Sequence, residues 1–145
     1  MKQMLLFLSL CFVFSSVSVF AVDGIESPKS CQLCGMDRTT FAQSRMLIVY
    51  ADGSKTGTCS VHCAAAELKD NAGKKVQSLL VADYNSKSLT DAKQATWVIG
   101  GKKRGVMTAL PKWAFAKLSE AETFVKQNGG KVAGFDEAMA LAEKE

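Results

Sequence analysis

The order of predicted strands and helices occurs twice along the chain, and this repetition is the strongest constraint on its fold. Residues 46–50 are rich in β-branched and aromatic side chains, and an Asp-Gly pair at 52–53 separates them from a second run at 55–58, as in a β-hairpin. Ser60 can cap an alanine-rich helix that runs to about residue 68, and residues 76–83 favour a third strand. The first half of the chain therefore predicts a ββαβ unit.

The second half of the chain repeats this order of elements. We expect a strand at 95–99, a turn formed by two glycines at 100–101 and a return strand at 103–107. A helix at 120–127 and a short last strand at 131–134 follow. This half therefore predicts a second ββαβ unit.

Two capping patterns predict where the last helices begin. Ser119, followed three residues later by Glu122, has the pattern of a capping box. Asp136 belongs to the residue types that cap helices, so we expect it at the start of a C-terminal helix.

The two predicted hairpins can be aligned with one gap, as VYADGSKTGTC over VIGGKKRGVM, which places Cys59 over Met107. We therefore expect an α+β fold of two similar ββαβ lobes in tandem, at 31–84 and 95–145, joined by a polar linker at 85–94. Lobes related by a pseudo-twofold axis would bring Cys59 and Met107 to equivalent positions, each at the end of a hairpin and before a helix.

Residues 1–21 have the pattern of a secretory signal peptide. A positive start and an apolar core at 4–14 precede a small-x-small sequence at 19–21, which predicts cleavage before Val22. Residues 22–30 are mostly polar, and we expect them to form a flexible lead-in. The signal peptide predicts a location outside the cytosol, and the mature chain has no apolar stretch long enough to cross a membrane.

A lipid anchor is not expected, because Leu10 stands where a lipobox needs a small residue before Cys11. The chain has a formal net charge of +4 at pH 7, without a long block of like charges. This charge is too small to favour nucleic-acid binding as the main task.

Four cysteines follow the predicted cleavage site, and they allow disulfides, a redox pair or a zinc site. An even number of cysteines outside the cytosol usually forms disulfides. Cys31 and Cys34 have the C-x-x-C spacing of thiol–disulfide oxidoreductases, although no strand precedes them and Gly35 follows. Together with Cys59 and Cys63 they could instead hold structural zinc, with a C-x-x-x-C second pair.

The donor types also favour Cu(I), a soft ion that prefers thiolate, thioether and imidazole ligands. Cys34 and Met36 place a thiolate and a thioether close together, and Met107 adds a thioether from the other half of the chain. Two other methionines, Met46 and Met139, lie in a predicted strand and an alanine-rich helix, so we expect them in the core.

The only histidine could add an imidazole donor. His62 lies between Cys59 and Cys63, whose spacing of four residues puts both thiols on one face of a helix. The imidazole would lie beside that face. His62 could be either a metal ligand or a solvent-exposed residue without a specific role.

Several short sequences, taken in order, resemble the NosL family. They are CQLCGM from Cys31, the DG turn, a cysteine-bearing helix start, VADY, WVIGG, Gly105 with Met107, and GGKVAGF ending at Phe135. The resemblance implies two ββαβ lobes, which are also similar to the lobes of organomercurial lyase, although a shared fold does not carry activity. It also implies a Cu(I)-binding accessory protein of the bacterial periplasm and not an enzyme.

In that family, copper is supplied for the maturation of nitrous-oxide reductase in denitrification, together with an ABC-type membrane complex. By resemblance, Cys34 and Met107 would be copper ligands in this chain. A further donor would come from the other candidates, which are Met36, Cys31, His62, Cys59 and Cys63.

We therefore expect a periplasmic, monomeric Cu(I) metallochaperone with a partly exposed site. Two alternatives stay open. One is a thiol–disulfide oxidoreductase that uses Cys31 and Cys34, and the other is a secreted protein stabilised by disulfides or zinc.

Overall fold

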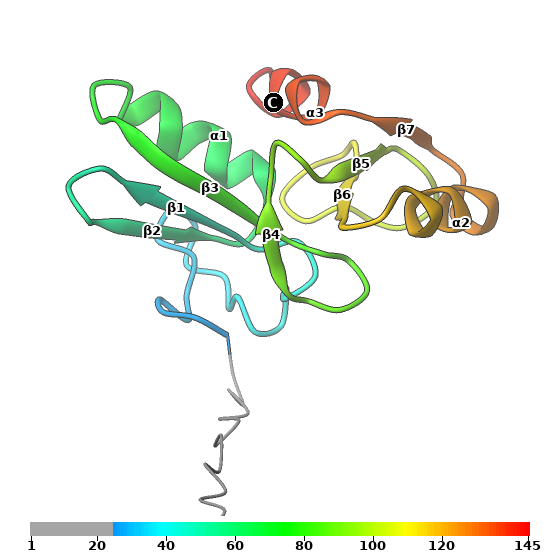
Figure 1. The fold of residues 1–145 in the computed structure, drawn as a ribbon, viewed down its shortest axis with the longest axis horizontal. Helices are drawn as coiled ribbons and strands as arrows, with labels where there is room; N and C mark the ends of the chain where they lie inside the picture. Colours follow the sequence, from blue (N-terminus) through cyan, green and yellow to red (C-terminus); the bar gives the residue numbers. More distant parts are fainter. Residues whose placement is uncertain (1–24) are drawn as a thin grey trace, which may run out of the picture.

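The computed structural model describes residues 25–145, which form two antiparallel sheets and three helices (Figure 1). The α+β class expected from the sequence is confirmed. The predicted signal peptide and the start of the predicted lead-in lie outside the described residues. Within the described part of the chain, no helix combines the length and the apolar character needed to span a bilayer.

The first sheet has the strand order β2-β1-β3-β4. β1 (Met46–Tyr50) and β2 (Lys55–Thr58) form the predicted hairpin around the Asp-Gly turn. α1 (Val61–Asp70) leads to β3 (Val76–Ala82), which pairs with β1 on the side away from β2. β4 (Leu89–Asp91) pairs with β3, so the segment predicted as a linker carries the fourth strand of this sheet.

The second sheet has the strand order β6-β5-β7. β5 (Thr96–Ile99) pairs antiparallel with both β6 (Lys112–Phe115) and β7 (Lys131–Ala133). α2 (Leu118–Asn128) connects β6 to β7, and α3 (Phe135–Ala142) follows and packs against α1 (Figure 1). The first strand of each ββαβ sequence thus lies between the other two strands of that sequence.

The return strand predicted at 103–107 is wrong. β5 pairs instead with β6, over all four residues of each strand, and a long loop connects them. Burial explains the difference, because every residue of β6 is buried whereas the basic residues at 102–104 are exposed and could not face a core. Met107 therefore lies inside this loop, and its position does not correspond to that of Cys59, which directly follows β2.

The helix starts agree with the sequence in one case only. α1 begins after Ser60 as expected, although the Ser60 side chain makes no capping hydrogen bond. α2 begins at Leu118 and α3 at Phe135, so Ser119 and Asp136 lie in first turns and the two capping predictions are wrong. An acidic side chain there is stabilised by the helix dipole without being the cap.

Two clusters of buried side chains hold the sheets and helices together. The larger cluster contains residues of the first sheet, α1 and α3, together with Trp97 and Ile99 of β5. Val98 points to the opposite face of β5 and belongs to the smaller cluster, with side chains of β6 and α2. Both faces of β5, the central strand of the second sheet, therefore pack against buried side chains. Met46 and Met139 are buried in the larger cluster, as expected.

Two glycine pairs allow the ends of β5 and β7 to approach each other. Gly130 has φ 94°, and a Cβ there would lie 2.9 Å from the carbonyl oxygens of both Ile99 and Gly100. Gly101 has φ 97°, and its Cβ would lie 2.8 Å from the Asn128 and Gly129 oxygens. Only glycine satisfies both the backbone angle and the spacing at these turns.

We predict that Gly130→Ala lowers the free energy of unfolding by about 2 kcal/mol or more, because an L side chain is strained at this φ and the methyl group has no room. Urea unfolding of the metal-free protein measures the change. Gly73→Ala is the matched control, since the space around its Cβ is open, and its effect should stay within about 0.5 kcal/mol. Equal losses in the two variants would contradict the prediction.

Candidate metal centre

Four cysteine side chains meet next to the smaller hydrophobic cluster. The sulfur atoms of Cys31, Cys34, Cys59 and Cys63 all lie within 4.8 Å of one another. Cys34 Sγ is 3.5 Å from Cys59 Sγ, which is 3.7 Å from Cys63 Sγ. These four cysteines, all within residues 25–145, are free thiols. Three of them are buried, and Cys34 is partly exposed.

Two segments of the chain supply these thiols. Cys63 lies in the first turn of α1, whereas Cys59 directly follows β2 and precedes the N-cap Ser60, so, contrary to expectation, the two thiols do not share a helix face. The extended backbone at Ser60 still leaves their sulfurs 3.7 Å apart. Cys31 and Cys34 lie in a tight loop, closed by a hydrogen bond of 2.8 Å from the Gly35 amide to the Cys31 carbonyl oxygen. Gly35 has φ 78°, which this turn needs and which glycine adopts without strain.

Hydrogen bonds hold the Cys31–Cys34 loop against the end of β2. The Gln32 amide donates to the Gly57 carbonyl oxygen at 3.0 Å, and the Gly57 amide donates to Gln32 Oε1 at 3.0 Å. Gly57 lies two residues before Cys59, so these bonds bring the two pairs of thiols together.

The crowded thiols perturb one another's ionisation. Hydrogen bonding from Cys63 lowers the pKa of Cys59 to about 6, against the effect of burial. The same hydrogen bond raises the pKa of Cys63. Burial, together with hydrogen bonds to Cys31 and Cys59, raises the pKa of Cys34 to about 11. At neutral pH the cluster therefore holds a thiolate at Cys59, stabilised by protonated neighbours.

The donor set and its spacing fit a soft metal ion. A tetrahedron of thiolates with metal–sulfur bonds of about 2.3 Å has sulfur–sulfur separations of about 3.8 Å. The separations of 3.5 and 3.7 Å are close to that value. Thiolates select Cu(I), Zn(II) or iron–sulfur clusters over hard cations such as magnesium and calcium. The four cysteines can thus take up such an ion with small adjustments.

Two methionines proposed from the sequence share a hollow on the surface. Met36 packs against the hydrophobic cluster that contains three of the cysteines. Met36 and Met107 also line one hollow on the surface, together with Phe41 and Arg104. Met107 is 43% exposed and has φ 57°, an unusual backbone conformation for a residue other than glycine.

His62 lies outside the group of four sulfurs. Its imidazole is partly exposed, and Nδ1 lies 3.7 Å from Glu145 Oε2. This nitrogen is buried and has no hydrogen-bond partner within the described residues. The structure thus brings the four cysteines into one group, with Met36 and Met107 at a surface hollow and His62 facing the C-terminal glutamate.

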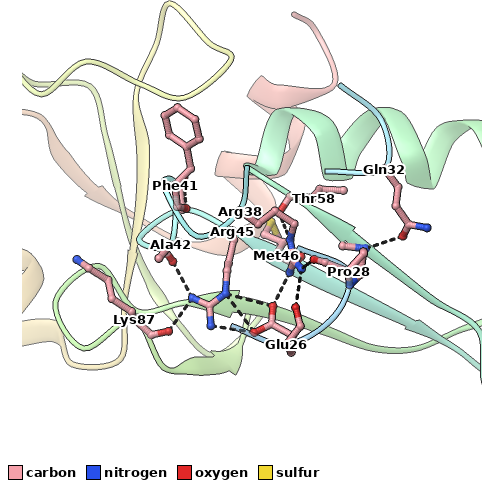
Figure 2. A network of polar contacts seen from close by, with 12 residues as sticks. Glu26, Pro28, Gln32, Arg38, Phe41, Ala42, Arg45, Met46, Thr58 and Lys87 are labelled. Atoms are coloured by element: carbon pink, nitrogen blue, oxygen red, sulfur yellow. Dashed lines mark hydrogen bonds and ion pairs between the residues drawn. The ribbon is translucent and has the colours of Figure 1, made fainter. Parts of the chain in front are cut away.

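An ion-pair network beside the centre was not expected from the sequence (Figure 2). The Glu26 carboxylate accepts hydrogen bonds from the buried guanidinium groups of Arg38 and Arg45. Burial would raise the pKa of Glu26, but the hydrogen bonds and charge of Arg45, with the charge of Arg38, hold it below its usual value. The described part of the predicted flexible lead-in is therefore held against the first sheet.

No signal in the sequence marked this network. Its members lie far apart along the chain and follow no helical or strand period, and buried arginine is rare enough that surface positions are the default expectation. Only the proximity created by folding identifies them.

The matches to known proteins cover most of the chain. The crystal structure of the copper chaperone NosL from Shewanella denitrificans has a similar fold, with a TM-score of 0.61 and 24% sequence identity over 79% of this chain and 92% of that chain. A search of curated proteins gave no match. The NosL family model matches residues 22–140, a stretch that includes both sheets and the four clustered cysteines. The chain therefore belongs to the NosL family.

Proposed function

We propose that this protein binds Cu(I) outside the cytosol and passes it to a partner. The observation that carries the proposal is the group of four cysteine sulfurs within 4.8 Å of one another, of which Cys34 is partly exposed. A soft, monovalent ion suits thiolate donors. Membership of the NosL family and a fold similar to that of a copper chaperone support copper as the cargo.

Cys34 is the ligand through which the ion would enter and leave. The other three sulfurs are buried, so a donor atom of a partner reaches the ion most easily beside Cys34. Cu(I) is stable with few ligands, and sulfur donors can therefore replace one another in turn. The partly exposed site expected from the sequence is part of this proposal.

Met107 and Met36 would act as weak ligands during transfer. A thioether is neutral and binds Cu(I) less strongly than a thiolate, so it favours release over storage. Both residues line the same hollow, and Met107 is exposed in a conformation that costs free energy. We propose no metal contact for His62, whose Nδ1 faces Glu145.

We also propose a recipient, a cellular location and an arrangement of the two sheets. The recipient would be nitrous-oxide reductase in the periplasm, reached with the help of an ABC-type membrane complex. The protein would act as a monomer and would catalyse no reaction. The two sheets with their helices would be two similar lobes in tandem, with the metal centre between them.

A structural zinc site is the second candidate, favoured by the near-tetrahedral spacing and by the burial of three sulfurs. Thiol–disulfide exchange through Cys31 and Cys34 has less support. Cys34 is the accessible thiol, and its raised pKa leaves little thiolate to attack a disulfide at neutral pH.

Anaerobic titration of the mature protein with Cu(I) and with Zn(II) separates these candidates. We expect Cu(I) to bind far more tightly, and Cys34→Ser to weaken Cu(I) binding by about a hundredfold, because a hydroxyl replaces a thiolate. Met107→Leu should change the affinity by less than about threefold but slow the transfer of Cu(I) to an external chelator.

Met139→Leu is the control for the loss of a thioether, because Met139 lies in the larger cluster away from the cysteines. It should change neither affinity nor transfer. Tighter binding of Zn(II) would instead support the structural site, and full Cu(I) affinity in Cys34→Ser would overturn the proposed role of that residue.

The affinity for Cu(I) should rise with pH. The raised pKa values of Cys34 and Cys63 keep both thiols protonated at neutral pH, so binding through these two sulfurs must displace their two protons. We expect the logarithm of the affinity to increase by about two for each pH unit between about pH 6.5 and 8.5. Competition with a chelator of known proton affinity measures this slope. A slope near zero would mean that Cys59 and neutral donors hold the ion without the other thiols.

A further inference from the structure

We infer that Arg38 is a positioning residue of the metal centre: its guanidinium joins the loop that carries Cys31 and Cys34 to the strand end that carries Cys59, and so brings the four sulfurs together before the ion arrives. The inference rests on the proposed function, because it concerns the same site. Within residues 25–145, the Arg38 side chain makes no hydrogen bond to a cysteine side chain. It acts through the backbone of the segments that flank the cysteines.

The first observation is that every N–H group of the Arg38 side chain has an oxygen acceptor (Figure 2). Nε donates to the Thr58 carbonyl oxygen at 3.1 Å, and Nη2 donates to the Met46 carbonyl oxygen at 2.9 Å and to the Glu26 carboxylate. Nη1 donates to the carbonyl oxygens of Glu26, at 3.1 Å, and of Pro28. A guanidinium has five N–H donors, so this one is fully satisfied.

The second observation is where those acceptors lie. Thr58 directly precedes Cys59, and Met46 begins the neighbouring strand β1. Glu26 and Pro28 belong to the segment that precedes Cys31. One side chain therefore connects the backbone next to both pairs of thiols.

The third observation concerns the base of the cysteine loop. The Arg38 amide donates to the Lys29 carbonyl oxygen at 2.8 Å, and Ser30 and Asp37 form an antiparallel bridge. These two contacts close the base of the loop that contains Cys31 and Cys34. A shift of Arg38 would move this loop as a unit.

Space for the guanidinium depends on a glycine. A Cβ at Gly57 would lie 2.6 Å from Arg38 Cζ and 2.8 Å from Pro28 Cδ. The side chain of Arg38 is fully buried at this point, so it cannot move into solvent without opening the structure. Gly57→Ala would therefore displace the guanidinium without removing its charge.

The physical consequence is preorganisation. Thiolates brought this close repel one another, and a mobile loop would lose conformational entropy when the ion fixes it. A clamp that already holds the loop removes that cost from the binding step. Groups that orient metal ligands in this way typically contribute about tenfold to a hundredfold in metal affinity.

Arg45 offers a matched control. It is also buried and binds the same Glu26 carboxylate, with Nη2 at 2.9 Å from Oε2. Its other acceptors are the carbonyl oxygens of Ala42 and Lys87, both at 2.7 Å and neither next to a cysteine. Loss of Arg45 should therefore cost stability without moving the thiols.

The experiment compares Arg38→Met, Arg38→Lys and Arg45→Met in the mature protein. We measure unfolding by urea, Cu(I) affinity by competition with a chelator, and the ultraviolet absorption of copper–thiolate bonds. We expect Arg38→Met to weaken Cu(I) binding by about tenfold or more and to reduce the absorption per ion, because fewer thiolates reach it. Arg38→Lys should recover little, since an ammonium group cannot reproduce the planar fork.

Arg45→Met should lose stability and keep both the affinity and the absorption of the wild type. If Arg38→Met does not fold, Gly57→Ala replaces it, with the same expected loss of affinity and absorption. Equal metal binding by the Arg38 variant, or by Gly57→Ala, and the wild type would overturn the inference. So would equal losses in the Arg38 and Arg45 variants, which indicate a general structural role. Failure of the wild type to bind Cu(I) would instead overturn the proposed function, and this inference with it.

Discussion

The short distances between the sulfur atoms of four thiols are the constraint on which the rest of the metal centre depends. Sulfur atoms within 4.8 Å of one another cannot all carry a negative charge in a buried place without a cation. In the metal-free protein the cluster meets this limit by holding its protons, with the thiolate at Cys59 stabilised by the neighbouring S–H groups. The cluster therefore favours binding of a soft cation, because the ion replaces the protons and removes the repulsion between the thiolates.

The fold brings these thiols together at a junction. Cys59 and Cys63 belong to the passage from β2 to α1, whereas Cys31 and Cys34 come from a loop that precedes the first strand. The same hydrophobic cluster includes Val98, Trp113 and other residues of the second half. Both halves of the chain thus build the surroundings of the cysteines.

The network around Glu26 holds the segment that leads to Cys31. Two guanidinium groups share one carboxylate, and their remaining donors are satisfied by backbone oxygens (Figure 2). Buried charges are tolerated only when they are paired and hydrogen-bonded in this way. The described segment before Cys31 is thereby joined to two buried arginines by hydrogen bonds.

Local patterns in the sequence determined the mixed α+β class, the β1–β2 hairpin at its Asp-Gly turn, and the strand that became β5, because periodicity and turn chemistry act over a few residues. They failed for the partner of β5, because the glycines and basic residues after Ile99 resemble a short turn, and only the burial of β6 selects the true strand. They also identified each cysteine as a candidate ligand, but they left disulfides, a redox pair, a zinc site and a copper site open. The grouping of the four sulfurs, the distance of His62 from them and the clamp formed by Arg38 were decided by the tertiary structure, since they depend on contacts between segments far apart in the chain.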